Sequence, residues 1–515
     1  MSKIRMLRNT LDRRQLMGGA IAAMALGYAG SALGQSSPNP QKGGSLRVGI
    51  AGGGPIDSLD PHSPITPADI ARVLNLYDGL GDDNEQAEYR PLLAEEFEVN
   101  PSATEWTIRI KQGAEFHNGK TIGADDVAYT IRRIIDPKNP RNAAPVMRSI
   151  DPAQIVKLDD RTIRLKLRRP DAALRDAFRI LNTGVVPVDF DPKNPVGSGP
   201  FRLDQFVPGE QSTFKRFENY HGQAPYVDEL VLIDLPDDVA RVNALLGGQV
   251  HAIEGLPYSQ IPVVSANSSF KVLTSKAGSF RPFTMRVDKP PFDDVRVRQA
   301  LRLLVDREQL VKLAFSGHGR VAYDAYSPND PCFDTSLVRE RDVKEARSLL
   351  ARAGHSNLQL ELATTAAAPG LLEASQIFAE QAREGDVTIN VKRLDQGGFF
   401  AEYTNWPFAV DYWTDNPYLN QVALGELATS PLNPTRFSDE EFTRLNDLAR
   451  AELDQNRRCE LVHQMQRISF ERGGLIIWGY PDTIDAHSAQ IGGLEPDLTG
   501  WGLNRYKFKK AYFVA

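Results

Sequence analysis

The sequence of 515 residues has only two cysteines, Cys332 and Cys459, and eight histidines. Neither cysteine lies at the spacing of zinc ligands, and no two histidines share a helical spacing, so direct metal coordination is not indicated and no cofactor is expected. In an oxidising compartment the two cysteines can form a disulfide, or both can remain buried thiols. The sequence leaves these two alternatives open.

Sequence motifs that mark catalysis are also missing. The chain has no Gly-x-Ser-x-Gly nucleophile turn, no Gly-x-x-x-x-Gly-Lys-Ser/Thr phosphate loop and no His-Glu-x-x-His pair. We therefore expect a protein that is not an enzyme. The alternative is a secreted peptide hydrolase, assembled from residues far apart in the sequence, or a chaperone-like peptide-handling protein.

An excess of basic residues is absent as well. Lys and Arg number 60 and Asp and Glu 66, so the net charge is −6. Without residues 1–34 the chain keeps 55 basic and 65 acidic residues, a net charge of −10. Nucleic-acid binding rests on a basic surface that neutralises phosphates, so this class of function is not expected.

The chain has one long apolar stretch, from Gly18 to Leu33, directly after the adjacent Arg13 and Arg14. A charged start, an apolar centre and small residues before a cut predict a signal peptide over residues 1–34, and the paired arginines resemble the twin-arginine signal. The alternatives are the general export route and an N-terminal membrane anchor, for which the stretch is short. We expect an exported, periplasmic protein of about 480 residues, enough for two or three domains.

Strand and helix patterns are mixed along the chain, which predicts an α/β or α+β fold in several lobes. The Asp-Asp-Arg turn at 159–161 joins two alternating runs and is the clearest hairpin signal. The other predicted strands are 45–50, 106–110 and 229–234, and the predicted helices are 67–80 with Gly79 as the stop, 124–131, 237–246 and one capped by Asp293 or Asp294.

Seven phrases, in order, resemble the peptide/nickel class of extracellular solute-binding proteins, known as family 5. Each phrase alone is weak, but together they span most of the chain. Gly197, Gly199 and Pro200 are expected to serve a turn with close backbone approach rather than a ligand. The phrases are Ser58–Pro61, Leu76–Leu80, Pro91–Glu95, Trp106–Gly119, Gly197–Phe201, Asn219–Gly222 and Pro291–Leu301.

The resemblance implies a type II periplasmic-binding-protein fold, with two lobes, a hinge and an inserted extra domain. Two chain crossings, near 274–283 and 481–488, would join the lobes and let them close on a solute. The partners implied are a peptide or peptide-like solute and an ABC permease in the inner membrane, with the protein itself a monomer. The implied domains are domain I at 43–76, 197–274 and 486–515, domain II at 77–196 and domain III at 275–485.

The ligand-facing candidates lie in Asp411–Tyr418, where dipeptide-binding relatives carry a Trp-Thr-Gly-Asp phrase whose aspartate holds the peptide's ammonium group. Asp415 is the nearest match, although the glycine is missing. A carboxylate in a closed cleft needs a cationic partner, and aromatic neighbours suit walls that accept varied side chains. The expected ligand-binding residues are Asp415, Trp413, Asn416, Tyr412, Tyr418 and Thr66.

One departure from the family pattern concerns the arginine with which dipeptide binders hold the peptide carboxylate. The corresponding stretch, Ala363–Leu372, contains no basic residue. Arg pairs with a carboxylate through two parallel hydrogen bonds, which Ala or Thr cannot provide. Longer peptides, opine-like conjugates or another cationic solute therefore fit as well as a dipeptide, and the metal-chelate receptors of the same family are a further alternative.

Overall fold

The computed structural model describes residues 40–515, so the predicted export signal at residues 1–34 lies outside the described residues. A seven-stranded sheet is built around β2, whose Leu46, Val48 and Ile50 are fully buried. β2 pairs in parallel with β11 and β12, as its apolar sequence favours. In sheet order the strands are β13 (Phe270–Ser275), β20 (Thr483–Ser488), β12 (Ala252–Ile253), β2 (Ser45–Ile50), β11 (Glu229–Asp234), β10 (Gln211–Arg216) and β9 (Phe201–Val207).

Helix α1 packs against this sheet and begins at a full set of N-terminal signals. Thr66 accepts a hydrogen bond from the Asp69 N–H, the Asp69 carboxylate accepts one from the Thr66 N–H, and Pro67 occupies the first turn. The elements in this part are α1 (Pro67–Leu76), α5 (Asp238–Leu246), η2 (Tyr258–Gln260), α6 (Ile261–Ser265), α15 (Gly502–Arg505), η4 (Phe508–Lys510), and the small sheet of β1 (Pro40–Gln41), β22 (Tyr512–Val514) and β21 (Ile491–Gly492).

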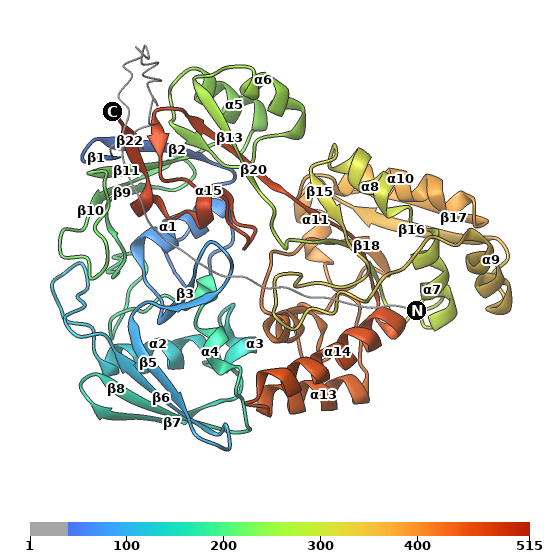
Figure 1. Ribbon diagram of the computed structural model, residues 1–515, viewed down its shortest axis with the longest axis horizontal. Coiled ribbons are helices and arrows are strands. Elements are labelled where there is room, and N and C mark those ends of the chain that lie inside the picture. The colour runs from blue at the N-terminus through green and yellow to red at the C-terminus, as the bar shows by residue number, and fades with distance from the viewer. Residues whose placement is uncertain (1–39) are drawn as a thin grey trace, which may run out of the picture. The chain divides into compact units, whose positions relative to one another are not determined.

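A four-stranded antiparallel sheet, with a core of its own, lies between α1 and β9 in the chain. The predicted hairpin is confirmed as β7 and β8, and α2 covers the sheet with Val127, Ile131 and Ile134 buried (Figure 1). The elements are β3 (Gly81–Asp83), β4 (Tyr89–Pro91), β5 (Ala94–Val99), β6 (Glu105–Ile110), β7 (Ile150–Asp159), β8 (Thr162–Leu167), α2 (Ala124–Ile134), α3 (Ala144–Met147), α4 (Leu174–Ala177) and η1 (Leu181–Thr183).

A six-stranded mixed sheet holds a third core, around Phe283, Phe378 and Trp478. Its strands in order are β15 (Gly319–Val321), β19 (Leu475–Pro481), β14 (Arg281–Met285), β18 (Phe408–Val410), β16 (Leu358–Thr364) and β17 (Val387–Arg393). Its helices are α7 (Val295–Leu304), α8 (Arg307–Ala314), α9 (Val343–Arg352), α10 (Leu371–Arg383), α11 (Gln396–Ala401), α12 (Tyr418–Gln421), the π-helix η3 (Val422–Glu426), α13 (Glu440–Ala451) and α14 (Gln455–Arg472).

Cys332 and Cys459 form a disulfide, which settles the alternative that the sequence left open. The bridge ties the loop that follows β15 to the first turn of α14, and Cys332 is buried in the core of that region. Among residues 40–515, no helix combines the length and the apolar character needed to cross a membrane.

The chain passes between the seven-stranded and the six-stranded sheet twice. It leaves β13 for β14 through residues 276–280 and returns from β19 to β20 through Asp482. β13 pairs with β20 and β14 with β19, so the two connections lie side by side (Figure 1). Both connections lie in the segments that the sequence analysis predicted.

The turn at residues 197–200 has the structural role that the sequence predicted. A side chain at Gly197 would place its Cβ 1.8 Å from the Leu76 carbonyl oxygen, and one at Gly199 would lie 2.5 Å from that of Asn75. The Gly199 N–H donates to the Leu76 carbonyl at 2.8 Å, because α1 ends at Leu76 and Tyr77 is extended. The predicted helix end near Gly79 was therefore wrong by three residues, because the turn binds the carbonyl of Leu76, where α1 ends.

Candidate functional site

A cavity of about 610 Å³ lies where three parts of the chain meet. Its walls come from the start of α1, from the region of the four-stranded sheet at 83, 140–145 and 179–182, from residues 413–432 beside the six-stranded sheet, and from the C-terminal segment. Its volume is in the range of small-molecule sites.

Asp415 lies in the wall of this cavity with only half of its carboxylate satisfied. Its Oδ2 accepts a hydrogen bond from Asn329 Nδ2 at 2.7 Å, whereas Oδ1 is buried and has no partner among residues 40–515. Burial raises the pKa of Asp415 to about 7, against the smaller effect of the Asn329 hydrogen bond. Gly278 makes room for the carboxylate, because a Cβ there would lie 2.4 Å from Asp415 Cγ.

Trp413 and Asn416 line the cavity together with Asp415. The backbone of Trp413 exchanges two hydrogen bonds with Phe280, and its Nε1 donates to Asp411 Oδ2 at 2.8 Å. Asn416 Nδ2 donates to Gln421 Oε1 at 2.9 Å. Phe280 is the last residue of the first connection between the sheets, so the cavity wall and that connection are directly joined.

The remaining three predicted residues lie outside the cavity wall. Tyr412 is 40% exposed and its ring lies 5.8 Å from the Arg281 guanidinium. Tyr418 is only 2% exposed and stacks on Tyr326 in a core. The Thr66 hydroxyl caps α1, while Pro64 and Ile70 on either side of it line the cavity.

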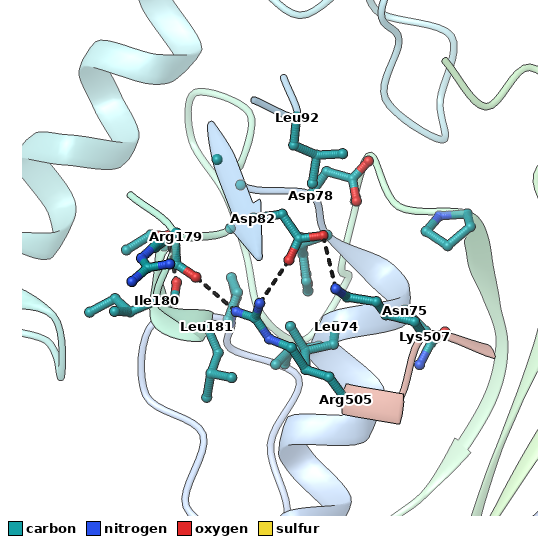
Figure 2. A pocket seen from close by; sticks show the side chains of 18 of the residues that line it. Leu74, Asn75, Asp78, Asp82, Leu92, Arg179, Ile180, Leu181, Arg505 and Lys507 are labelled. Carbon is teal, nitrogen blue, oxygen red and sulfur yellow. Dashed lines mark hydrogen bonds and ion pairs between the residues drawn. The ribbon is translucent and has the colours of Figure 1, made fainter. Parts of the chain in front are cut away.

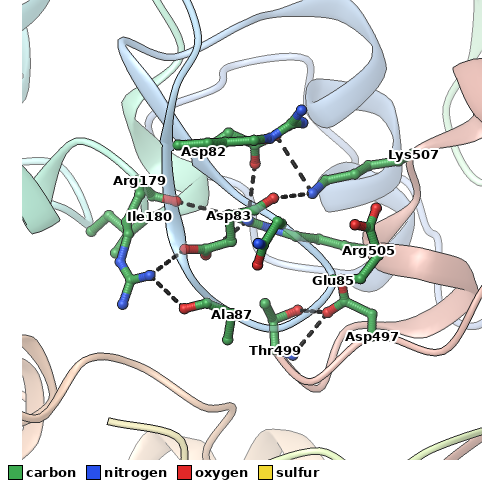
Figure 3. A network of polar contacts seen from close by, with 12 residues as sticks. Asp82, Asp83, Glu85, Ala87, Arg179, Ile180, Asp497, Thr499, Arg505 and Lys507 are labelled. Atoms are coloured by element: carbon green, nitrogen blue, oxygen red, sulfur yellow. Dashed lines mark hydrogen bonds and ion pairs between the residues drawn. The ribbon is translucent and has the colours of Figure 1, made fainter. Parts of the chain in front are cut away.

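Arg179 and Arg505 bring positive charge to the cavity, but carboxylates hold both (Figure 3). Arg505 Nη1 donates to Asp82 at 2.9 Å and to Asp83 at 2.8 Å, and its Nη2 donates to the Arg179 carbonyl at 2.8 Å. Arg179 Nη1 donates to Asp83 and, at 2.7 Å, to the carbonyl of Ala87. This network fixes the C-terminal segment to the turn after β3.

A cavity of about 50 Å³ lies next to this network, with Asp82 and Arg505 facing each other inside it (Figure 2). Burial alone would raise the pKa of Asp82, but the charges of Lys507, Arg505 and Arg90 hold it below its ordinary value. Burial lowers the pKa of Lys507 to about 8. With room for only a few waters, this space supports the charged network and does not hold a solute.

Arg141 is the most loosely held guanidinium of the large cavity. Its Nη1 lies 3.4 Å from Ser63 Oγ and 3.5 Å from Asp60 Oδ2, while Asp60 is paired more closely with Arg133 at 2.6 Å. Arg141 Nε is buried and has no hydrogen-bond partner in the described part of the chain. Arg141 therefore keeps hydrogen-bonding capacity for an anionic group.

Of the residues predicted from the sequence, Asp415, Trp413 and Asn416 line the cavity. The residues that were not predicted are Arg141, Arg179, Arg505 and Trp501 in the cavity wall and Asn329, which contacts Asp415. Asn329 reaches Asp415 across 86 residues of sequence, and no local pattern marks such a contact. Residues 363–372, where an arginine was sought, do not line the cavity, whose guanidinium groups come from elsewhere. Trp501 had a local signal that could have marked it as a cavity residue, because it is an aromatic residue between two glycines.

Within residues 40–515, no group of three or more His, Cys, Asp or Glu side chains is placed to hold a metal ion. What the structure places around the cavity is a carboxylate with a free oxygen, a loosely held guanidinium and an indole. Two sheets joined by two adjacent crossings, with a cavity at their junction, define the class of type II solute-binding proteins.

Comparison with known proteins identifies the family. The profile of the bacterial extracellular solute-binding proteins, family 5, matches residues 88–431, and the chain belongs to this family. A glutathione-binding protein, GsiB, from Salmonella typhimurium is 24% identical over 489 residues, which cover 89% of this chain and 93% of the relative.

Two solved structures share the fold. The periplasmic binding protein DppA from Helicobacter pylori, in complex with the peptide STSA, superposes with a TM-score of 0.81 at 19% identity, covering 92% of this chain and 99% of that one. NikZ from Campylobacter jejuni, in complex with Ni(L-His), also gives a TM-score of 0.81 at 19% identity, covering 91% and 99%. The family match makes the chain a solute-binding protein, and the two structures show that it shares their fold.

Proposed function

We propose that the chain captures a zwitterionic peptide or peptide-like solute, with the ammonium group on Asp415 and a carboxylate group on Arg141. The single observation that carries this proposal is the free, buried Oδ1 of Asp415 in the wall of a 610 Å³ cavity. An ionised carboxylate that is buried with one oxygen unpaired is costly unless a cation approaches it. A solute ammonium provides that cation and a charge-assisted hydrogen bond.

The guanidinium groups of the cavity support the anionic half of the proposed solute. Asp82 and Asp83 hold two of the three arginines through their Nη groups, whereas the Nη1 contacts of Arg141 are long, so Arg141 is the most available of the three. A carboxylate on Arg141 would receive charge-assisted hydrogen bonds at no loss of a strong internal pair. This arrangement gives the chain a carboxylate-binding group without an arginine at 363–372.

The relative from Salmonella typhimurium suggests the first solute to test, because its name is that of a glutathione-binding protein. Glutathione is a tripeptide-like solute with one ammonium and two carboxylate groups. Its charges match a cavity wall that contains two aspartates, Asp83 and Asp415, and three arginines. We propose glutathione and unmodified tripeptides as the starting panel.

Closure is part of the proposal. The connections at 276–280 and at Asp482 would act as the hinge between a lobe with the seven-stranded sheet and a lobe with the six-stranded sheet. In this scheme the domains are 43–76, 197–274 and 486–515 for domain I, 77–196 for domain II and 275–485 for domain III. The mature protein would act in the periplasm as a monomer and deliver its solute, unchanged, to an inner-membrane permease.

The test compares each solute with two blocked forms in calorimetric titrations. N-acetylation removes the ammonium and C-amidation removes the carboxylate, while the rest of the molecule stays the same. The wild-type protein should prefer the free solute over both forms. Asp415→Asn should bind the free and the N-acetylated solute equally well. Arg141→Gln should bind the free and the amidated solute equally well.

Equal binding of free and N-acetylated solute by the wild-type protein would disprove the role of Asp415. Mass spectrometry of the solutes after a long incubation provides the second readout. Full recovery of the solute is expected for a receptor, whereas conversion of the solute would support the hydrolase alternative.

A further inference from the structure

A second cavity, of about 330 Å³, lies away from the proposed solute site. Three arginines line it from the region of the four-stranded sheet, namely Arg148 after α3 and Arg168 and Arg169 after β8. The opposite wall consists of residues 427–429 after η3, and of Thr443 and Asp447 on α13. No residue lines both this cavity and the solute cavity.

The positive charge of this arginine cavity is not neutralised. Arg169 forms an ion pair with Asp447, with 3.3 Å between Nη1 and Oδ1. Arg148 donates to the hydroxyl of Thr429, a neutral partner. In the described chain neither Arg148 nor Arg168 forms an ion pair with a carboxylate, so three guanidinium groups share one carboxylate.

Asp171, a buried carboxylate whose charge also acts on Arg148, is already engaged. It accepts hydrogen bonds from Arg450 at 3.3 Å and from Ser149 Oγ at 2.8 Å. Burial, together with the charges of Arg169 and Arg450, lowers the pKa of Arg148 to about 10. The protein therefore holds Arg148 half-buried among like charges without supplying its counter-ion.

We propose that the arginine cavity binds a small oxyanion, such as inorganic phosphate, through Arg148, Arg168 and Arg169. Guanidinium groups match the geometry of phosphate and carboxylate oxygens, and two or three of them around one cavity would hold an oxyanion through charge-assisted hydrogen bonds. The Thr429 hydroxyl, which contacts Arg148 from the opposite wall, is within reach of the same group.

An oxyanion in this cavity would tie together the two sides that also face each other across the solute cavity. Residues 140–145 and 179–182 on one side, and residues 413–432 on the other, line the solute cavity. If an oxyanion holds these two sides together and so raises the affinity for the solute, the solute must raise the affinity for the oxyanion by the same factor. Phosphate and solute should therefore raise each other's affinity, a part of the inference that rests on the proposed function.

The oxyanion site itself can be tested without any transported solute. The purified protein is titrated with inorganic phosphate at constant ionic strength, by calorimetry and by thermal unfolding. One phosphate should bind per chain and raise the unfolding temperature. Arg148→Gln should weaken phosphate binding at least tenfold, and Arg168→Gln, at an exposed position that leaves the fold intact, should weaken it measurably.

Two control variants locate the effect. Arg383→Gln removes an exposed arginine from α10 and should leave phosphate binding unchanged. Arg141→Gln should also leave it unchanged, since Arg141 lines the solute cavity. Equal phosphate binding by the wild-type, Arg148→Gln and Arg168→Gln proteins would overturn the proposal, and so would loss of binding in Arg141→Gln. Either failure would leave the solute-binding role untouched.

The coupling is read from the solute titration, repeated with and without saturating phosphate. The solute affinity of the wild-type protein should rise at least threefold, while Arg148→Gln should show its phosphate-free affinity under both conditions. An unchanged wild-type affinity would disprove the coupling and leave the oxyanion site standing on the direct titration.

Discussion

Replacing Asp415 by Asn removes the charge of this side chain and keeps its shape and its hydrogen bond from Asn329. Burial raises the pKa of Asp415 from its ordinary value of 3.8 to about 7. This difference corresponds to roughly 4 kcal/mol, at about 1.4 kcal/mol for each tenfold change in proton affinity, and is an upper value because waters in the cavity reduce it. The ligand-free wild-type protein should therefore be less stable than Asp415→Asn by up to this amount.

The sign of the effect follows from proton linkage. A carboxyl group with a raised pKa in the folded protein binds its proton more tightly there than in the unfolded chain, so the stability of the wild-type protein falls as pH rises. Below pH 4 the charge is absent in both states and the two proteins should be equally stable. The difference should grow between pH 4 and 7 and stay constant above pH 7.

The measurement is urea unfolding of both ligand-free proteins at several pH values between 4 and 8. Asp411→Asn is the matched control, four residues away. Burial raises the pKa of Asp411 too, to about 6, but Asp411 accepts hydrogen bonds from Tyr403, Tyr412 and Trp413. Its replacement should therefore destabilise the protein most at pH 4, where no charge is relieved, and less above pH 6. A stability loss in Asp415→Asn at pH 8 would refute the argument that this carboxylate is held without a partner.

Three further results are expected. Arg141→Gln should lower the affinity for a carboxylate-bearing solute by about 10- to 100-fold, the loss of one charge-assisted contact, with unchanged affinity for the amide as the check. Solute should change the tryptophan fluorescence, and a variant with both Trp413→Phe and Trp501→Phe should lose most of this change, because both indoles line the cavity. Reduction of the Cys332–Cys459 bridge, or its replacement by two serines, should cost about 4–5 kcal/mol of unfolding free energy, since the cysteines are 127 residues apart. A loss under 1 kcal/mol would contradict the loop-entropy argument.

Local signals in the sequence were sufficient for most of the elements that build the lobes. The alternation in 45–50 and 229–234 gave β2 and β11 with their exact bounds, and the Asp-Asp-Arg turn gave the β7–β8 hairpin. Helix α1 ended three residues before Gly79 because a turn 120 residues later binds its last carbonyl. Such contacts between distant segments have no local signature.

Only a part of the cavity wall could be predicted from the sequence, for the same reason. The family phrase around 411–418 led to Asp415 and Trp413, which line the cavity together with the other residues of 413–417, whereas Tyr412 and Tyr418 at the two ends of this run do not. Tyr418 begins helix α12 and packs on Tyr326, a contact that only the fold reveals. Arg141 and Asn329 come from loops that carry no motif, so the charges opposite Asp415 could not be predicted.

The most direct test of the account is native mass spectrometry of the protein purified from its own organism. One small molecule per chain is expected, with both an amine and a carboxylate, released unchanged on unfolding and bound again by the wild-type protein but much more weakly by Asp415→Asn. A bound solute without an amine, or one that the protein converts to another compound, would contradict the account.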